Sequence, residues 1–576
     1  MIPTTIHRFP HDPVLVQLLA IAHQTSPAET VIEDDALGCQ KTYPEFLADI
    51  VATRELLRAQ LPPSALDTQG LLCEKRQNVA VLAKSGYEFL VAFFAIRSLG
   101  GVCAPLGTAI LPEEADYLLS MTSSISILAG QGSMERASNI RTYMEQTKPE
   151  SLTVVPVSSD AKPLGGTGRA IETDHGCIMA PDGPGLIMLT SGTTGRPKGA
   201  VLPRCSIIGT GVRESGSVAL VYRPNHWMGG VRDIIQSLLS GRRVYSLKAK
   251  LRDARAEDVL RAFRTTLITH IAFMPDVLRR MMLLLTRGRD QSDIPQGERD
   301  LWHSYFRGLS MLRCSGGFLE RSVRDFWIDL MGLPFDNFYS STELGGLAIG
   351  GPSQIYGSMG TPIPGIKVKL SEGDRGEICV KSPKMLLHYI GNEHTIESIF
   401  DKEGYYKTGD LAKYINGEYI FAGRVATDCI QYTIFQFSTL AVEDGLISLP
   451  YISEACVVAV PHAKFRQLCG AVVRLRPDSQ IPNNMTTLGL IRSDLEGSLP
   501  AYMMPTLLKV LKHEEELPCT VAGKPKKKEI LSIYFGSVNG AQVENYPPEI
   551  ETCYIPQPGE VEATKPWDWD ARQFEQ

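Results

Sequence analysis

The sequence predicts an α/β fold with a large N-terminal body of several subdomains, built from layered sheets and helices, and a small α+β domain after it. The chain has 576 residues, which is too many for one hydrophobic core, so two to four structural units are expected. Apolar strand-like runs alternate with amphipathic helical runs through most of the chain. From about residue 424 these runs become shorter, as is typical of a smaller unit.

The clearest strand–helix–strand unit lies early in the body. Residues 79–83 predict a strand and residues 86–99 predict a helix. Gly100 and Gly101 then form the turn into a second strand that begins at Val102. This order is typical of a parallel sheet that is covered by helices.

The C-terminal part predicts a second, smaller architecture. Short strands are expected at residues 457–460 and 471–475, with helices between them. We therefore expect an N-terminal body at residues 1–423 and a C-terminal domain at residues 424–536. Residues 537–576 are rich in Pro, Glu and Gly with few aliphatic side chains, which predicts a flexible tail.

Composition and charge argue against several classes of protein. The formal net charge of −6 offers no electrostatic basis for binding nucleic acid. No apolar run approaches the roughly 20 residues that are needed to cross a bilayer. The 12 cysteines form no C-x-x-C pair and the first residues contain no signal-peptide core, so a cytoplasmic protein with reduced thiols is expected.

The most informative motif is the run L-T-S-G-T-T-G-R-P-K-G-A at residues 189–200. Glycines let successive backbone N–H groups converge on an anion, and Ser and Thr hydroxyls add further donors. Arg196 and Lys198 supply positive charge on either side of Pro197. The pattern predicts a loop that binds a polyphosphate, and its spacing differs from that of a Walker A loop. A Gly/Ser/Thr-rich surface turn is the alternative when the loop is considered alone.

This loop closely resembles the phosphate loop of the adenylate-forming superfamily, which contains acyl-CoA synthetases, aryl-CoA ligases, peptide-synthetase adenylation domains and firefly-type luciferases. The resemblance implies that the body binds ATP and that the small C-terminal domain is a mobile lid. It implies that the phosphates are bound by Thr190, Ser191, Gly192, Thr193, Thr194, Gly195 and Lys198.

Two later segments continue the resemblance. Cys314-Ser315-Gly316-Gly317-Phe318 is a glycine turn, and Ser315, Gly316 and Gly317 stand where the superfamily lays a flat adenine against backbone. The run N-F-Y-S-S-T-E at residues 337–343 matches the family's Y-G-x-T-E signature, although Ser340 stands where a glycine is usual. The nucleotide-site residues that this match implies are Asn337, Phe338, Tyr339, Ser340 and Thr342.

Within that signature the resemblance implies separate roles. Tyr339 would stack on the adenine, and Thr342 would hydrogen-bond the α-phosphate. Glu343, together with Thr194, would bind Mg²⁺, a hard cation that prefers carboxylate, hydroxyl and phosphate oxygens. A helix N-terminus with a glutamate in its first turn is the alternative for Glu343 alone.

Three further charged residues occur in the family's order. Asp410 in T-G-D would accept hydrogen bonds from the two ribose hydroxyls. Arg424, fourteen positions on in G-R, would reach ribose or phosphate. Lys524 in L-P-C-T-V-A-G-K would close over the α-phosphate as the catalytic cation, whereas residues 526–528 are expected to form a solvated face.

The segment after Arg424 departs from the family pattern. In G-R-V-A-T-D the hinge between the two domains is expected at Asp428, with Thr427 as the alternative. Gln431, Ile434 and Ala441 replace residues that are frequent in the family. These departures concern the step that follows adenylate formation.

The organic acid is expected near R-P-N-H-W-M-G-G at residues 223–230, which resembles the family's P-x-x-H-x-x-G segment. His226 would lie at the mouth of the acyl pocket, with a buried structural histidine as the alternative. Trp227, Met228 and Phe318 predict an apolar or aromatic wall. Arg223 or Arg232 could pair with a second carboxylate of the substrate, although a surface position is expected for both.

The resemblance implies a ligase that uses ATP, Mg²⁺ and coenzyme A to convert a carboxylic acid to an acyl-adenylate and then to a thioester. The catalytic residues would be Lys524, Thr342, Glu343 and His226. Two alternatives remain: a stand-alone adenylation enzyme that loads a separate carrier protein, and a nucleotide-binding pseudoenzyme. The expected partners are the small-molecule acid, ATP and coenzyme A, with neither a nucleic acid nor a membrane span. The sequence predicts no oligomeric state.

Overall fold

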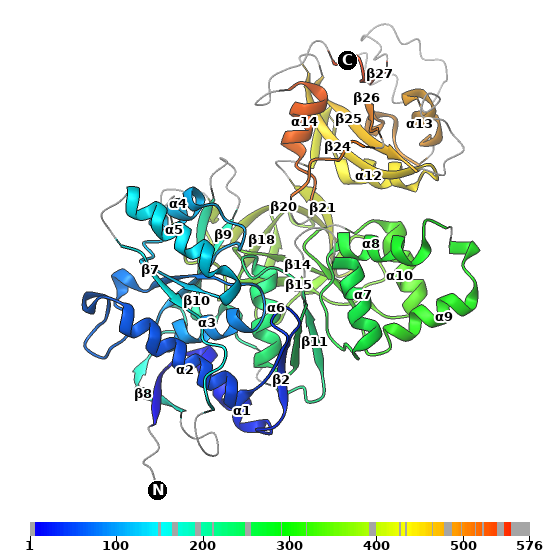
Figure 1. Ribbon diagram of the computed structural model, residues 1–576. Helices are drawn as coiled ribbons and strands as arrows, with labels where there is room; N and C mark the ends of the chain where they lie inside the picture. Colours follow the sequence, from blue (N-terminus) through cyan, green and yellow to red (C-terminus); the bar gives the residue numbers. More distant parts are fainter. Residues whose placement is uncertain are drawn as a thin grey trace.

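The computed structural model describes most of the chain, and Figure 1 shows a large body with a smaller C-terminal unit standing above it. The described residues are 6–147, 151–163, 171–190, 197–209, 212–247, 255–289, 291–317, 319–390, 399–424, 428–432, 435–462, 465–476, 487–496, 498–512, 514–520, 524–537 and 546–553. The α/β architecture confirms the predicted fold class.

The first part of the body is built on a seven-stranded sheet in the order β19–β10–β9–β5–β4–β6–β7. Its strands are β4 (Asn78–Leu82), β5 (Val102–Pro105), β6 (Ser126–Ala129), β7 (Thr153–Pro156), β9 (Pro184–Thr190), β10 (Lys198–Pro203) and β19 (His388–Ile390). The helices of this part are α1 (Pro13–Gln24), α2 (Tyr43–Gln60), α3 (Tyr87–Ser98), α4 (Pro112–Met121) and α5 (Met134–Thr147).

The predicted strand–helix–strand unit is confirmed as β4, α3 and β5. The two strands run parallel, with Asn78 opposite Val102. All residues of α3 are buried, which explains why its sequence is apolar on every side. The one arginine of this helix, Arg97, is neutralised by Asp12 at the start of α1.

The rest of the body contains two smaller sheets and five further helices, of which α7, α8, α9 and α10 lie at the right of Figure 1 and α6 near its centre. The strands are β1 (His7–His11) paired with β8 (Ile171–Ile178), and β11 (Val218–Val221), β12 (Arg243–Ser246), β2 (Thr30–Asp34) and β3 (Cys39–Thr42). The helices are α6 (Met228–Leu239), α7 (Arg255–Thr265), α8 (Pro275–Thr286), α9 (Gln296–Tyr305) and α10 (Arg321–Met331).

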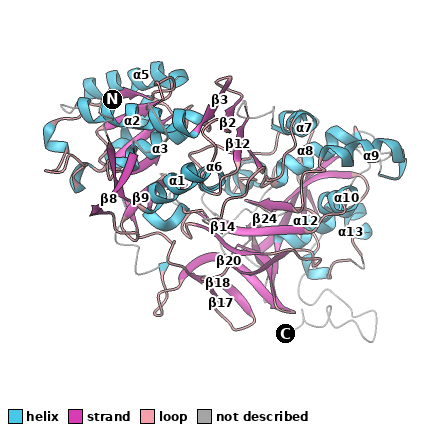
Figure 2. Cartoon of the chain, turned by 90° about the horizontal axis from the view of Figure 1, so that it is seen from below, coloured by secondary structure: helices cyan, strands magenta, loops and turns pink. Residues whose placement is uncertain are grey.

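An eight-stranded sheet links these parts, and Figure 2 shows several of its strands from below. In sheet order its strands are β13 (Leu312–Ser315), β14 (Phe335–Ser341), β15 (Gly346–Gly350), β16 (Ser358–Pro362), β21 (Glu418–Arg424), β20 (Tyr406–Ile415), β18 (Arg375–Lys381) and β17 (Lys367–Leu370). Strands β13 and β14 run parallel, and the other neighbours run antiparallel.

The C-terminal unit has its own hydrophobic core, whose buried members lie between Ile430 and Ile550. Its strands are β22 (Cys429–Tyr432), β23 (Phe435–Ser438), β24 (Ile452–His462), β25 (Arg466–Leu475), β26 (Leu507–Val510) and β27 (Glu551–Thr552). Its helices are α12 (Thr439–Ser448), α13 (Leu488–Asp494) and α14 (Lys527–Phe535). The 3-10 helices among the described residues are η1 (Pro63–Ala65), η2 (Glu74–Arg76), η3 (Gln131–Ser133), η4 (Arg204–Ile207), η5 (Gln291–Asp293) and η7 (Ala501–Met503).

The prediction of helices between the two C-terminal strands was wrong. Strands β24 and β25 pair directly as antiparallel neighbours, and His462 lies opposite Arg466, which leaves too little chain for a helix. Both strands are largely buried, and their continuous apolar runs are long enough for one extended hairpin.

Part of the expected tail packs against the C-terminal unit. Strand β27 pairs with β26, and the backbone N–H of Leu488 donates to Glu551 Oε2 at 2.8 Å. Ile550 is buried in the core of the unit. Trp567 and Trp569 lie outside the described residues.

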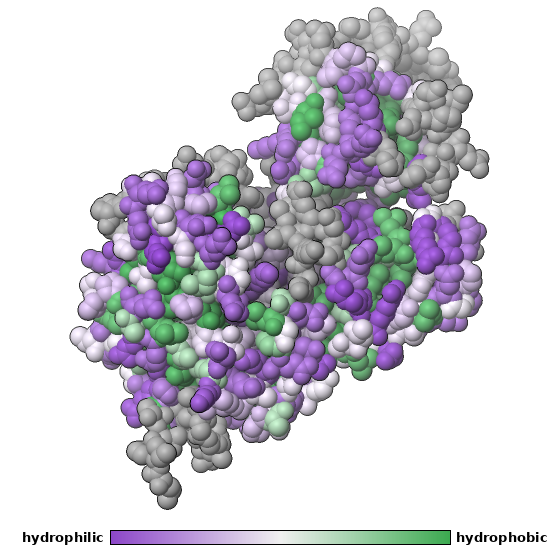
Figure 3. All heavy atoms as spheres, in the orientation of Figure 1, coloured by the Kyte–Doolittle hydropathy of each residue, from purple (hydrophilic) through white to green (hydrophobic). Residues whose placement is uncertain are grey.

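The face of the molecule in Figure 3 is mostly hydrophilic, with hydrophobic residues scattered over it. No described helix is both long and apolar enough to span a membrane.

Candidate active site

The predicted phosphate loop closes a hairpin between β9 and β10. Thr190, the last residue of β9, lies directly opposite Lys198, the first residue of β10. The hairpin therefore fixes the two ends of the loop beside each other. The expected ligands Ser191, Gly192, Thr193, Thr194 and Gly195 lie outside the described residues.

Lys198 and Glu343 are brought together by a tyrosine that the sequence analysis did not assign to the site. Tyr389 lies on β19, which pairs with β10, and its hydroxyl donates to Glu343 Oε1 at 2.9 Å. The Nζ atom of Lys198 lies 5.8 Å from the centre of the Tyr389 ring. Burial and the charge of Glu343 raise the pKa of Tyr389, so its hydroxyl stays a donor. Only the pairing of distant strands reveals this contact.

The donor set fits a divalent cation that arrives with a triphosphate. Glu343 is half-buried, and its Oε2 atom makes no hydrogen bond with a described residue. Among the described residues no group of three or more His, Cys, Asp or Glu side chains could hold a metal by itself. A single carboxylate suits Mg²⁺, because this ion takes its other ligands from water and phosphate.

The predicted adenine turn lies beside the tyrosine motif, because β13 and β14 are parallel neighbours. Ser315 pairs with Phe338, so Gly316 and Gly317 follow at the carboxyl end of the same sheet edge. Gly316 has φ +92°, a conformation that side chains rarely adopt, and both glycines are exposed. This leaves open backbone next to the tyrosine motif, as a flat base requires. Phe318 lies outside the described residues.

The tyrosine motif occupies the end of β14. The strand has a bulge between Tyr339 and Ser340, and Asn337 Nδ2 donates to Ser358 O at 3.5 Å. Thr342 lies in the turn that follows, where its carbonyl accepts from the N–H of Gly345 at 3.1 Å. The bulge and the turn therefore connect Tyr339 on β14 to Glu343 in the turn that follows the strand.

Tyr339, Asp410 and Arg424 form one connected group. Asp410 on β20 lies directly opposite Arg424 on β21, and the guanidinium Nε donates to Asp410 Oδ1 at 2.5 Å. The Tyr339 hydroxyl donates to the other oxygen, Oδ2, at 2.7 Å. Asp410 is 3% exposed, so Arg424 and Tyr339, rather than water, stabilise its negative charge.

Lys524 enters this group from the C-terminal unit. Its backbone is fixed by two hydrogen bonds with Thr520, one of them from the Lys524 N–H to Thr520 Oγ1 at 3.1 Å. Desolvation and the positive charge of Arg424 lower the pKa of Lys524, while Asp428 and Asp410 act in the opposite direction. Lys524 therefore lies close enough to Asp410 and Arg424 for their charges to act on its ammonium group.

His226 precedes α6 at the other side of the site. Burial lowers the pKa of His226 to about 4, so its ring is neutral at neutral pH. The ring makes no hydrogen bond with a described residue, and a methyl group built on Gly107, two residues after β5, would lie 3.7 Å from it. A neutral, largely buried ring suits the edge of an apolar pocket.

The sequence predicted that Arg223 and Arg232 lie on the surface, and this prediction is wrong. Arg223 is 4% exposed and Arg232 is 6% exposed. Arg223 donates to Ser315 Oγ at 3.1 Å and to the carbonyl of Phe273 at 2.9 Å. It therefore anchors the adenine turn, which a sequence pattern could not reveal.

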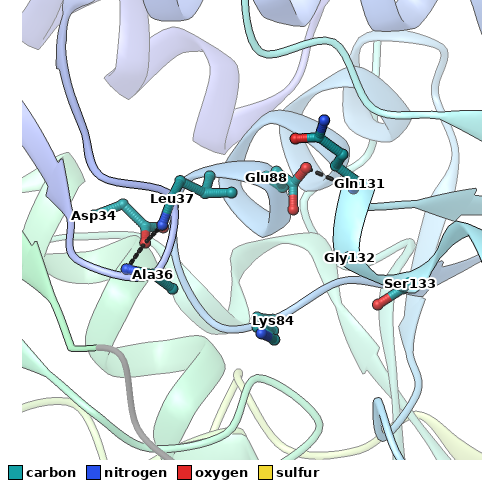
Figure 4. A pocket seen from close by; sticks show the side chains of 8 residues that line it. All are labelled: Asp34, Ala36, Leu37, Lys84, Glu88, Gln131, Gly132 and Ser133. Atoms are coloured by element: carbon teal, nitrogen blue, oxygen red, sulfur yellow. Dashed lines mark hydrogen bonds between the residues drawn. The ribbon is translucent and has the colours of Figure 1, made fainter.

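A cavity of about 260 Å³ lies at the carboxyl ends of β4 and β6, and none of the site residues described above lines it (Figure 4). Its lining residues are Asp34, Ala36, Leu37, Lys84, Glu88, Gln131, Gly132 and Ser133. Burial raises the pKa of both Asp34 and Glu88. The sequence analysis missed this cavity because its walls come from separate segments of the chain.

Comparisons with known proteins agree with this geometry. The model of the AMP-binding enzyme family matches residues 64–390, and that of the AMP-binding enzyme C-terminal domain matches residues 441–524. The chain is 34% identical to acyl-CoA ligase oryP of Aspergillus oryzae, over 91% of this chain and 93% of that protein. It is 25% identical to the mitochondrial malonate–CoA ligase ACSF3 of Mus musculus, over 81% and 83% of the two chains.

Solved structures share the fold. ATP-bound MatB from Rhodopseudomonas palustris superimposes with a TM-score of 0.70 at 21% identity, covering 90% of this chain and 98% of that one. The o-succinylbenzoate CoA synthetase MenE from Bacillus subtilis gives 0.68 at 20% identity, covering 89% and 97%. The chain therefore belongs to the AMP-binding enzyme family, in the adenylate-forming superfamily.

Proposed function

We infer that the protein is an AMP-forming acid–thiol ligase. A carboxylate oxygen of the substrate bonds to the α-phosphorus of ATP, and pyrophosphate leaves. The thiol of coenzyme A then attacks the acyl carbon, and AMP leaves as the thioester forms. The observation that supports this inference is the connected group of Tyr339, Asp410 and Arg424, with Lys524 near enough for the charges of Asp410 and Arg424 to act on it.

The chemistry of the first step needs positive charge rather than a base. A carboxylic acid is already ionised at neutral pH, because its pKa lies near ~4. The obstacle is repulsion between two anions and the charge that accumulates in the transition state. We propose that Lys198 and Lys524 lower this barrier by electrostatic attraction from opposite sides of the α-phosphate, with Thr342 as a hydrogen-bond donor.

The nucleotide itself is positioned by neutral and charged contacts. We propose that Asp410 accepts hydrogen bonds from the ribose hydroxyls while Arg424 holds its carboxylate in place. Asn337, Phe338, Tyr339 and Ser340 would line the adenine side, with Gly316 against the base. Glu343, with Thr194, would bind Mg²⁺, which when present neutralises charge on the phosphates.

We also propose the predicted division into a body at residues 1–423 and a lid that begins at residue 424, with a hinge at Asp428. Residues 546–553 of the predicted tail pack on the lid, so the lid extends beyond residue 536. Asp428 is 6% exposed and pairs with Lys527 Nζ at 2.9 Å. The same ammonium group lies 3.0 Å from Glu443, so Lys527 does not belong to a solvated face. These ion pairs join Asp428 to helices α14 and α12 of the C-terminal unit. Thr427, the alternative hinge residue, lies outside the described residues.

Pyrophosphate release with a panel of carboxylic acids tests the proposed function. Release that coenzyme A accelerates, with thioester in the products, is the expected result. Adenylate that accumulates without thioester would instead support loading of a carrier protein. No release across the panel would support a pseudoenzyme, provided that ATP still binds in a calorimetric titration.

A further inference from the structure

Arg232 is a buried cation that the proposed reaction does not use. It lies on α6, and its side chain retains 7% of its accessible surface. Nη2 donates to Asp233 Oδ1 at 3.1 Å, while Asp233 Oδ2 lies 3.6 Å from Nε of Arg223. Two buried guanidinium groups therefore share one carboxylate, which leaves one positive charge without a partner among the three.

Both arginines have a donor without a hydrogen bond, but Nε of Arg223 is enclosed by protein, whereas the free donors of Arg232 are not fully enclosed. The terminal nitrogens of Arg223 are occupied by Ser315 Oγ and by the carbonyls of Ala272 and Phe273. By contrast, Nε and Nη1 of Arg232 make no hydrogen bond with a described residue. Neither is fully enclosed, so both face space that a water molecule or a ligand can reach.

The position of Arg232 places these donors beside the reacting groups. Met228 and Arg232 are four residues apart on α6, so both lie on the same face of the helix. This face packs against Gly346: a methyl group built there would lie 3.2 Å from Arg232 Cδ and 3.9 Å from Met228 Cε. Gly346 comes three residues after Glu343, and His226 comes two residues before Met228.

A second cation lies in the same neighbourhood. The carbonyl of Lys384 packs against Gly345, the residue before Gly346. Burial lowers the pKa of Lys384, and the positive charge of Arg232 contributes to the shift. A buried site with excess positive charge is stabilised by an anion, and an arginine fork matches a carboxylate in two hydrogen bonds.

We propose that Arg232 determines specificity by binding a second carboxylate of the acid substrate, so that the protein activates dicarboxylic acids in preference to monocarboxylic acids. This inference rests on the proposed ligase function. One carboxylate would react at the α-phosphate, and the other would pair with the unpaired nitrogens of Arg232. An apolar tail in the same place would leave the guanidinium buried without a counter-charge.

The test compares matched pairs of acids in the pyrophosphate-release assay. Each straight-chain or aromatic dicarboxylic acid is assayed beside the monocarboxylic acid of the same skeleton. We expect kcat/KM for the best diacid to exceed that of its monoacid partner by about 100-fold or more, because a site built for a polar group rejects the analogue that lacks it. Arg232→Met should reduce this ratio by about the same factor.

Two further variants separate specificity from structural damage. Arg232→Lys keeps the charge but not the planar fork, so it should retain part of the preference. Arg289→Met removes a different arginine, which pairs with Glu298 near the surface, and should leave the ratio unchanged. A purely structural role for Arg232 would lower both rates together and leave the ratio intact.

The outcomes distinguish this inference from the function on which it depends. A wild-type preference for monocarboxylic acids, or a ratio that Arg232→Met does not change, would overturn the assignment of Arg232 while leaving the ligase function in place. Absence of pyrophosphate release with every acid of both classes would contradict the ligase function itself.

Discussion

Lys524 differs from the lysines that follow it in the sequence. Lys526 pairs with Glu529 at 3.0 Å, and Lys527 is held by Asp428 and Glu443. Lys524 forms no ion pair with a described residue, and its pKa is lowered by desolvation and by Arg424. A cation that is not paired within the protein is available to a phosphate.

Lys524→Ala should slow adenylate formation by about 10²–10³-fold, because the transition state loses a positioned positive charge. ATP affinity should change little, since the other nucleotide contacts lie on the body. Single-turnover pyrophosphate release and calorimetric ATP binding measure the two effects. Lys528→Ala, which alters an exposed lysine on α14, is the control. An unchanged rate in Lys524→Ala would refute the assigned role.

His226 should stay neutral through the ordinary working range of pH. Its pKa of about 4 lies below the usual value because burial disfavours the charged ring. The folded state therefore binds fewer protons than the unfolded chain between pH 6.5 and about 4, and this residue makes the protein less stable as the pH falls through that window.

An NMR titration of the His226 ring measures this directly, with the resonance assigned by loss of the signal in His226→Phe. Ring shifts that stay constant down to about pH 5 are expected, because burial lowers the pKa of the ring to about 4. A midpoint near the value of a free histidine would show instead that the ring is solvated.

At the scale of elements, Asp12 ties three parts of the body together. It lies at the start of α1, where its Oδ1 accepts from the N–H of Val14 at 3.1 Å. Its oxygens also bind Arg97 of α3 at 2.8 Å and Arg204 of η4 at 2.7 Å. Asp12 and Arg97 are completely buried, so neither charge has water as an alternative partner.

Asp12→Ala should destabilise the body by about 3–5 kcal/mol, because two buried guanidinium groups lose their counter-charge. The shift of the first unfolding transition in urea measures this loss. Glu55→Ala is the matched control, since Glu55 pairs with Arg54 but is largely exposed. Equal shifts in the two variants would show that Asp12 is not the central anchor.

At the scale of the whole molecule, a hydrogen bond joins the body to the C-terminal unit. The hydroxyl of Tyr356 donates to Asp444 Oδ1 at 3.0 Å, and Arg321 lies 4.1 Å from the centre of the Tyr356 ring. Asp444 belongs to α12, so this contact favours the lid orientation that the structure shows.

Tyr356→Phe should broaden the distribution of lid positions, since a hydrogen bond of this kind contributes about 0.5–1.5 kcal/mol. Distances between spin labels on the body and on α13 measure the distribution. Tyr451→Phe removes a similar bond, to Asp494 at 2.6 Å, inside the C-terminal unit, and is the control. An unchanged distribution in Tyr356→Phe would exclude a role for this contact in lid position.

The sequence by itself determined the fold class, the strand–helix–strand unit around α3 and the order of the nucleotide motifs. The fold class and the strand–helix–strand unit follow from local periodicity, and the motif order follows from glycine-rich and charged motifs. Each of these signals depends on residues that are close in the chain. Asp410 and Arg424 are an example: the resemblance of T-G-D and G-R to the family motifs implied that both residues bind the nucleotide, and β20 and β21 place them opposite each other.

Only the tertiary structure decided which distant residues meet. The contact of Tyr389 with Glu343 needs β19 beside β10, and the burial of Arg223 and Arg232 depends on segments that lie tens of residues away. An arginine near an apolar run reads as a surface residue from sequence alone, because its long side chain usually reaches water. Here the surrounding strands and helices close off that path, so the guanidinium of Arg232 remains inside with a charge that a substrate can neutralise.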